Sequence, residues 1–271
     1  MFSNLKLKIK NSRFIIIFKK IIILLIKQIN WLGSGLSIRL VKWTGKSSQF
    51  IHPKHLIDQS PDWLKFFSKN DVVLDIGCHN GQRDFKLAPK VQKIIAFDYD
   101  PKFLNQAIDW QSKEKIDNID FLKISAEEIL PFSNNSFDKI LFLDVLEHLY
   151  NRDQILRECY RILKPGGKMI LAIPNTQTSW KKFQKSAGLN FYSDPDHKIE
   201  YSKEEIILEH QKAGFELLEV NPVGYDFPLT GLIDLIGGIS LSLYRNLWQW
   251  KINKVIKNPS DTIGFMVISE K

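Results

Sequence analysis

Two apolar runs, each with an aspartate at its carboxyl end, restrict the fold of this chain more than any other feature. The first run contains Asp75, just before a turn with Gly77 and Gly81. The second run covers residues 94–97 and is followed at once by Asp98. In an open α/β sheet, ligands bind outside the carboxyl ends of the strands, where glycines admit close backbone approach and an acid accepts hydrogen bonds from ribose. The pattern therefore predicts a nucleoside-binding α/β sheet.

The spacing of the turn distinguishes it from a dinucleotide-binding loop. It reads Asp75-x-Gly77-x-x-x-Gly81 and lacks the G-x-G-x-x-G fingerprint. It resembles motif I of the class I S-adenosylmethionine-dependent methyltransferases, which is usually D-x-G-x-G-x-G. His79 stands where that family has its middle glycine. The resemblance implies S-adenosyl-L-methionine as the cofactor.

The resemblance to these enzymes, in particular to the type 11 and ubiquinone-pathway methyltransferases, continues in order along the chain. Ser125 replaces the first acid of a stretch that the family usually writes DAExLPFxDxSFD. The matching segments are 97–101 (FDYDP), 125–138 (SAEEILPFSNNSFD), 140–149 (ILFLDVLEHL), 161–168 (RILKPGGK), 201–205 (YSKEE) and 213–215 (AGF). Together they cover about residues 60–224 and the last strand.

This resemblance implies the fold class and the domain organisation. We expect an α/β fold with a Rossmann-like, seven-stranded, mostly parallel sheet, helices on both faces and an antiparallel last strand. Residues 58–271 would form the methyltransferase domain and residues 1–57 a helical N-terminal appendage. Residues 225–260 would be a helical insertion, divided near Gly237-Gly238, that either forms a lid or covers the sheet.

The resemblance also implies the cofactor-binding residues. Asp98 would hold the ribose, with Tyr99 beside the adenine, and Asp144 would lie near the sulfonium. The residues expected to bind the cofactor are Asp75, Gly77, Cys78, Gly81, Asp98, Tyr99, Ala126, Glu127 and Asp144.

Methyl transfer from a sulfonium needs alignment, and a base when the acceptor is a hydroxyl group. His148 and His197 are the candidate catalytic bases, because they follow the fourth and fifth strands of the expected sheet. A structural role within its own loop is the alternative for each. Asp144, Glu147 and His148 are spaced so that a helix would project them together. A divalent metal there is a second alternative, although we assign no metal ligand.

The charge of the chain is unevenly distributed along the sequence. The net charge is +8, yet residues 1–57 contain no acid and eleven Lys or Arg, which leaves 27 basic against 30 acidic residues in the rest. A nucleic-acid-binding enzyme would carry its basic surface around the site, so we expect no nucleic acid partner. The two cysteines form no disulfide framework, which fits a cytoplasmic setting.

The N-terminal arm is apolar as well as basic over residues 14–32. Lys6, Arg13, Lys20 and Lys27 recur every seven residues, so a helix would carry them as one basic stripe. We expect this helix to lie in the membrane interface, where apolar area and attraction to anionic lipid add together. A spanning helix and a helix packed on the protein itself are the alternatives.

These patterns predict a methyltransferase at the cytoplasmic membrane surface, peripherally associated, that acts on a small or lipid-linked acceptor, with methylation at oxygen favoured over carbon or nitrogen. A non-catalytic membrane-bound adaptor on the same fold is the alternative. A nicotinamide-dependent oxidoreductase would share Asp98 but lacks the glycine fingerprint.

Overall fold

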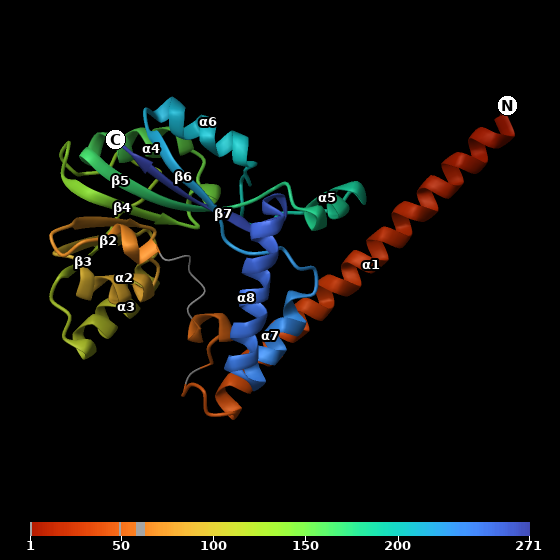
Figure 1. Cartoon of the computed structure of the whole chain (residues 1–271), viewed down its shortest axis with the longest axis horizontal. Helices are drawn as coiled ribbons and strands as arrows, with labels where there is room; N and C mark the ends of the chain where they lie inside the picture. Colours follow the sequence, from red (N-terminus) through yellow and green to blue (C-terminus); the bar gives the residue numbers. More distant parts are fainter. Residues whose placement is uncertain (1, 49, 58–62) are drawn as a thin grey trace. The chain divides into compact units, whose positions relative to one another are not determined.

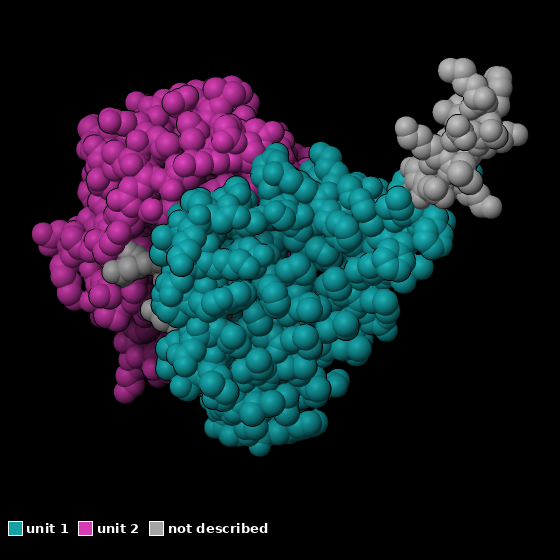
Figure 2. Space-filling model, turned by 45° about the vertical axis from the view of Figure 1, so that its right-hand side comes forward, with its two compact units in different colours: residues 1–60, 176–192, 222–263 teal, residues 61–175, 193–221, 264–271 magenta. Residues whose placement is uncertain are grey.

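The computed structural model describes residues 2–48, 50–57 and 63–271 and, within the first helix, side chains from Arg13 onward. The chain divides into two compact units (Figure 2). Unit 1 comprises residues 1–60, 176–192 and 222–263, and unit 2 comprises residues 61–175, 193–221 and 264–271. The sequence prediction drew the boundary at residue 57 and kept 225–260 with the sheet, whereas the compact units group 222–263 with the N-terminal segment.

Unit 2 contains a seven-stranded sheet with the strand order β3-β2-β1-β4-β5-β7-β6. The pairs among β1 to β5 are parallel, and β7 runs antiparallel to β5. This confirms the predicted fold class. The strands are β1 (Val72–Ile76), β2 (Lys93–Asp98), β3 (Ile119–Lys123), β4 (Phe137–Leu143), β5 (Leu163–Pro174), β6 (Glu216–Pro222) and β7 (Gly264–Glu270).

The central strands form because their residues are almost continuously apolar, as parallel strands covered by helices require. β4 and β7 are buried over most of their length. Helix α3 packs on β2 and β3, and α4 packs on α6 (Figure 1). The helices of this unit are α2 (Gln82–Leu87), α3 (Pro101–Glu114), α4 (Arg152–Ile162) and α6 (Lys203–Ala213).

Local signals set the ends of these helices. Asp100 accepts a hydrogen bond from Lys102 N at the start of α3, and Pro101 occupies the first turn, where its missing N–H costs nothing. Ser202 and Glu205 form a reciprocal capping box at the start of α6. These caps fix where each helix leaves the carboxyl edge of the sheet.

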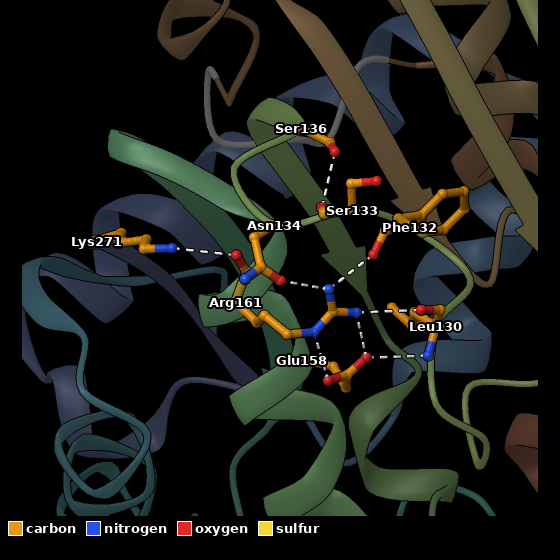
Figure 3. Close-up of polar contacts among 8 residues, drawn as sticks. All are labelled: Leu130, Phe132, Ser133, Asn134, Ser136, Glu158, Arg161 and Lys271. Atoms are coloured by element: carbon orange, nitrogen blue, oxygen red, sulfur yellow. Dashed lines mark hydrogen bonds and ion pairs between the residues drawn. The ribbon is translucent and has the colours of Figure 1, made fainter.

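Arg161 ties the loop before β4 to helix α4 (Figure 3). Its guanidinium donates to Glu158 and to the carbonyl oxygens of Leu130 (3.1 Å) and Phe132 (2.7 Å). Glu158 in turn accepts from Leu130 N at 3.0 Å. These bonds, with one to Asn134 Oδ1 at 2.9 Å, satisfy the polar groups of a loop that has no regular structure.

Unit 1 is helical, and its longest element is α1 (Phe2–Trp43). The others are α5 (Ser179–Ser186), α7 (Thr230–Ile239) and α8 (Leu241–Lys257). The insertion divides at Ser240, which caps α8, and Gly237 and Gly238 lie inside α7. The expected break at the glycine pair is therefore wrong by two residues, because packing keeps both glycines helical: a Cβ on Gly237 would lie 2.9 Å from Tyr244.

The second half of α1 packs closely on α7. A Cβ on Gly33 would lie 2.4 Å from the carbonyl oxygen of Gly231, so both positions require glycine. Asn30 donates to Pro228 O at 2.7 Å and accepts from Gly231 N at 3.0 Å. Ser34 donates to the buried Asp234 at 2.8 Å. This part of the N-terminal helix therefore matches the alternative in which the arm packs on the protein itself.

Residues 14–32 of α1, which overlap the start of this contact, leave large apolar side chains exposed. Ile23 is buried, yet Phe14 is 69% and Trp31 is 75% exposed. The remaining exposed apolar residues of this part are Ile15, Ile16, Ile17, Phe18, Ile21, Leu24, Leu25, Ile29 and Leu32. No helix among the described residues combines the length and the apolar character that crossing a membrane requires.

Candidate functional site

The turn after β1 is held against β2 by main-chain hydrogen bonds. Gly77 N and Cys78 N both donate to Phe97 O at 2.9 Å, and Gly81 N donates to Cys78 O at 3.0 Å. Gly77 and Gly81 have φ values of 72° and 74°, which favour glycine. A Cβ on Gly77 would also lie 2.5 Å from Val145. The glycines are thus required by the backbone path of the turn.

His79 occupies the position of the family's middle glycine. It has a φ of 52°, in the left-handed region that histidine adopts more readily than most residues. Its ring stacks on Phe103 of α3 with centroids 3.6 Å apart. The backbone N–H of His79 donates to Asp98 Oδ2 at 2.9 Å. The substitution is therefore accommodated by stacking and by a hydrogen bond to the neighbouring acid.

Asp98 lies at the carboxyl end of β2 and is almost fully buried. Asp100 N donates to its second oxygen at 3.0 Å, so backbone donors orient both oxygens of the carboxylate. Tyr99 beside it is 73% exposed. Glu127 accepts from Tyr150 N (2.7 Å) and Asn151 N (3.0 Å), and Ala126 in the same loop is half-buried. Both residues therefore belong to the loop between β3 and β4, and Glu127 binds the backbone just before α4.

Beneath the turn lie two buried acids, Asp75 on β1 and Asp84 on α2. Burial raises the pKa of Asp75 to about 7 and that of Asp84 well above its ordinary range. The charge of Asp75 raises the pKa of Asp84 further, and neither carboxyl oxygen of Asp84 has a hydrogen-bond partner among the described residues. Asp84 escaped the sequence analysis. The sequence shows only that an acid stands on the same helical face as Leu87 and Ala88, at a position where an apolar residue is expected.

Asp144 follows β4 with a φ of 59° and points to a partner on α2. Its carboxylate accepts from Arg83 at 2.9 Å, and Arg83 also donates to Leu143 O at 3.3 Å. The next element is a short 3-10 turn, Leu146–His148. Asp144 therefore does not share a helix with Glu147 and His148, contrary to the spacing argument.

The side chains of the two candidate bases, His148 and His197, are in contact. The rings of His148 and His197 pack edge to face with centroids 4.7 Å apart. His197 Nδ1 lies 2.9 Å from the buried carboxylate of Glu200, and its Nε2 lies 3.8 Å from Glu147. Burial and the neighbouring His197 lower the pKa of His148. His148 can therefore present a neutral imidazole at neutral pH, beside a histidine that contacts Glu200.

Glu147, His148 and His197 are also a group whose ligand atoms lie within 4.8 Å of one another. His197 Nε2 lies 3.8 Å from Glu147, so the three residues are close enough to hold a metal ion. Asp144, which the metal hypothesis included, is engaged with Arg83 instead.

The residues around the turn fit a cationic nucleoside cofactor. S-adenosylmethionine carries an ammonium group, a sulfonium group and two ribose hydroxyls, all of which suit acidic partners. Asp98, a hydrogen-bond acceptor at the carboxyl end of β2, therefore matches the ligand that the motif implies.

Comparison with known proteins agrees with this geometry. Residues 74–171 match the methyltransferase domain family. A probable S-adenosylmethionine-dependent methyltransferase of Mycolicibacterium smegmatis is 29% identical over 54% of this chain and 52% of its own length. A ubiquinone biosynthesis O-methyltransferase of Dechloromonas aromatica is 30% identical over 49% of this chain and 58% of its own length. The chain spans about half the length of these curated relatives.

Solved structures share the fold at low sequence identity. A SAM-dependent methyltransferase from Methanosarcina mazei superimposes with a TM-score of 0.57 and 18% identity, over 79% of this chain and 99% of that one. The [4+2]-cyclase SpnF has a TM-score of 0.55 and 18% identity over 76% of each chain. The motifs, the family match and the fold agree, and the chain therefore carries a class I S-adenosylmethionine-dependent methyltransferase domain.

Proposed function

We propose that the chain transfers a methyl group from S-adenosylmethionine to a hydroxyl oxygen of a small or lipid-linked acceptor. The observation that supports this is the contact between His148 and His197, backed by Glu200. A neutral His148 can accept the proton of a hydroxyl group as the oxygen attacks the methyl carbon. The ubiquinone O-methyltransferases among the relatives support an oxygen acceptor.

The cofactor would be held by the residues around the turn. The acidic groups would face its ammonium and ribose hydroxyls, and Asp144 would lie near the sulfonium because it follows β4 at the same edge of the sheet. When bound, the cofactor supplies an activated methyl group. Tyr99, Ala126 and Glu127 are proposed to border the adenine, and Gly77, Cys78 and Gly81 the methionine side.

Methyl transfer is tested by incubating the full chain with S-adenosylmethionine that carries a deuterated methyl group and with a polar lipid extract. We expect one acceptor mass to rise by one labelled methyl group, and His148→Gln to lower its rate at least a hundredfold with unchanged cofactor affinity. If the cofactor stabilises the protein thermally but no acceptor in any extract is labelled, the adaptor alternative gains support. If neither the cofactor nor S-adenosylhomocysteine raises the melting temperature, the proposal fails.

We further propose that the enzyme works peripherally at the cytoplasmic membrane surface, through the exposed apolar residues of α1. An apolar patch of this extent on a basic segment that contains no acid suits the interface of an anionic bilayer. Apolar insertion and attraction of lysines to anionic headgroups would add together. A lipid-linked acceptor would then lie within reach of the same surface.

Vesicle sedimentation tests this second proposal. The full chain should sediment with phosphatidylglycerol vesicles and much less with phosphatidylcholine vesicles. Phe14→Ser combined with Ile17→Ser should abolish sedimentation, whereas Ile108→Ser, an exposed apolar residue of α3, should not. Substitutions are preferable to deletion of residues 1–32, because deletion also removes the Asn30 contacts with α7. Equal sedimentation of all three proteins would contradict the proposal.

A further inference from the structure

A cavity of about 380 Å³ lies within unit 2 at the start of α4. Its walls come from side chains within residues 150–157, from Ile199 and Tyr201, and from Glu209 on α6. Its volume falls in the range of about 300–1,000 Å³ that small-molecule sites occupy. Among the described residues, none that we assign to the cofactor or to catalysis lines it. The site described above therefore leaves this cavity unexplained.

The cavity adjoins the two loops that carry the candidate bases. Tyr150 and Ile199, which line it, each follow one of the two histidines by two residues. Backbone hydrogen bonds join the loops, because Lys198 N and Ile199 N donate to Glu147 O at 2.8 Å and 3.3 Å. A molecule held in the cavity is therefore in contact with the segments that position the proposed base.

Three polar side chains of the cavity wall, Asp153, Gln154 and Arg157, come from the first turns of α4. Their spacing places them on one side of the helix. None of these side chains forms a hydrogen bond or an ion pair with another described residue. Arg152 adds a second guanidinium to the wall, and one of its nitrogens donates to Leu149 O at 2.5 Å. The wall therefore offers unused hydrogen-bond donors and acceptors.

The charges of the wall restrict the ligand, because two arginines face two acids, Asp153 and Glu209. Glu209 also lies 3.4 Å from Lys212. Lys198 lies over the ring of Tyr150, 5.1 Å from its centroid, and does not line the cavity. An anion would meet the acids and a cation the arginines, whereas a neutral ligand rich in hydroxyl groups donates to the acids and accepts from the arginines at once. The exposed ring of Tyr150 adds an apolar face.

We infer that this cavity binds a sugar residue of the acceptor, which is therefore a glycosylated molecule. The inference rests on the proposed function and narrows its acceptor group to a sugar hydroxyl. A sugar ring is uncharged and carries several hydroxyl groups, so it matches the mixed wall. The attacking hydroxyl oxygen would bond to the methyl carbon as the carbon–sulfur bond breaks. The electron pair of that bond would go to sulfur, and the hydroxyl proton would go to His148.

The position of a transferred label tests the chemical class of the acceptor. The full chain is incubated with S-adenosylmethionine that carries a deuterated methyl group and with a polar lipid extract, and the labelled acceptor is isolated and hydrolysed in acid. We expect mass spectrometry to find the labelled methyl group on a released monosaccharide. A label on an aromatic ring or on a lipid chain would overturn the inference and leave methyl transfer intact. If no extract yields a labelled acceptor, the proposed function fails together with the inference.

Substitutions in α4 test the cavity itself. Arg157→Ala and Asp153→Ala should each raise KM for the isolated acceptor about tenfold or more, because each removes a charged hydrogen-bonding group. We expect kcat and the affinity for S-adenosylhomocysteine to stay unchanged, and circular dichroism verifies the fold of these exposed, unpaired positions. Lys113→Ala on α3, an exposed cation outside the cavity, is the control and should leave KM unchanged. A wild-type KM in both α4 variants would overturn the assignment of the cavity, even with a labelled sugar.

Discussion

At the scale of single residues, the site depends on acids whose surroundings set their charge. Asp98 is oriented by two backbone N–H groups, whereas neither carboxyl oxygen of Asp84 has a hydrogen-bond partner among the described residues. Burial raises the pKa of Asp75 and of Asp84. We propose that Asp98, with its backbone donors, is the acid that holds the ribose.

Replacing Asp98 tests the ribose assignment. Asp98→Ala should weaken S-adenosylmethionine binding at least tenfold, because hydrogen bonds to a charged acceptor are worth about 1.5–3 kcal/mol. Calorimetry measures the affinity, and circular dichroism verifies the fold. Asp109→Ala on α3 provides the control, since its side chain pairs only with Lys113 at the surface. An unchanged affinity for Asp98→Ala would remove this residue from the cofactor site.

The pH dependence of the rate tests His148. Its folded pKa is lowered by burial and then by His197, so the base is already neutral at pH 6.5 and is protonated only at lower pH. At saturating cofactor, kcat should fall on the acidic side below pH 6.5 and stay level toward neutrality. His197→Asn removes one cause of the lowered pKa, so the acidic limb should move to higher pH. If the acidic limb of the kcat–pH profile does not move, His197 does not influence the titration of His148.

At the scale of elements, the contact between α1 and α7 depends on glycine. A Cβ on Gly231 would lie 2.5 Å from Asn30 Cα, which is backbone and cannot rotate away. Two helices can approach this closely only where neither carries a side chain. The same contact allows Asn30 to bond both Pro228 O and Gly231 N.

Glycine substitutions in α7 and in α1 should therefore have opposite effects on stability. Gly231→Ala should destabilise the protein by about 1–3 kcal/mol through overpacking. Gly35→Ala on α1 should stabilise it by about 0.5–1 kcal/mol, because nothing lies within 4 Å of its Cβ and alanine favours helix. Urea denaturation monitored by circular dichroism gives both values. Equal effects would argue against the close crossing of α1 and α7.

The Arg161 contacts make stability depend on acid pH. The hydrogen bond from Arg161 is the main reason that the pKa of Glu158 is lowered. Glu158 thus contributes stability at pH values above its unfolded pKa, and this contribution is lost as pH falls through the lower folded pKa. Arg161→Met should cost about 2 kcal/mol at pH 7 and less at pH 3. Urea denaturation at pH 7 and at pH 3 measures the stability lost at each pH, and an equal loss at both would contradict the prediction.

The sequence predicted the elements better than their contacts. The apolar strands and the acids at their ends were readable because burial between helices demands apolar runs. The predicted break of the insertion at Gly237-Gly238 was two residues too early. Glycine has a low helix propensity, which suggested a break, but both glycines lie in α7, where they pack closely against Tyr244 and Ser37. The burial of Asp84 could not be predicted from the sequence, because acidic residues are ordinarily exposed. His148 and His197 were found separately, and only the tertiary structure joins them.

At the scale of the whole molecule, the two compact units are interleaved in sequence. The methyltransferase match, residues 74–171, lies within unit 2, whereas unit 1 is assembled from three separate segments. Neither unit is one continuous stretch of chain. Function should therefore be studied with the full chain, since a truncation at residue 57 would remove the α1 surface on which α7 packs.

The long helix α1 has one further consequence, which concerns its susceptibility to proteases. Its second half is fixed by α7, whereas residues 13–29 expose most of their large apolar side chains and bond to Ser186 and Asn190 only through Lys19 and Lys27 among the described contacts. A helical stretch of that length is marginal in water without packing. Trypsin should therefore cut first at Arg13 or Lys20, leaving the rest of the chain intact. Anionic vesicles should slow this cleavage, which gel electrophoresis would follow over time. The N-terminal segment would then persist only where lipid covers it.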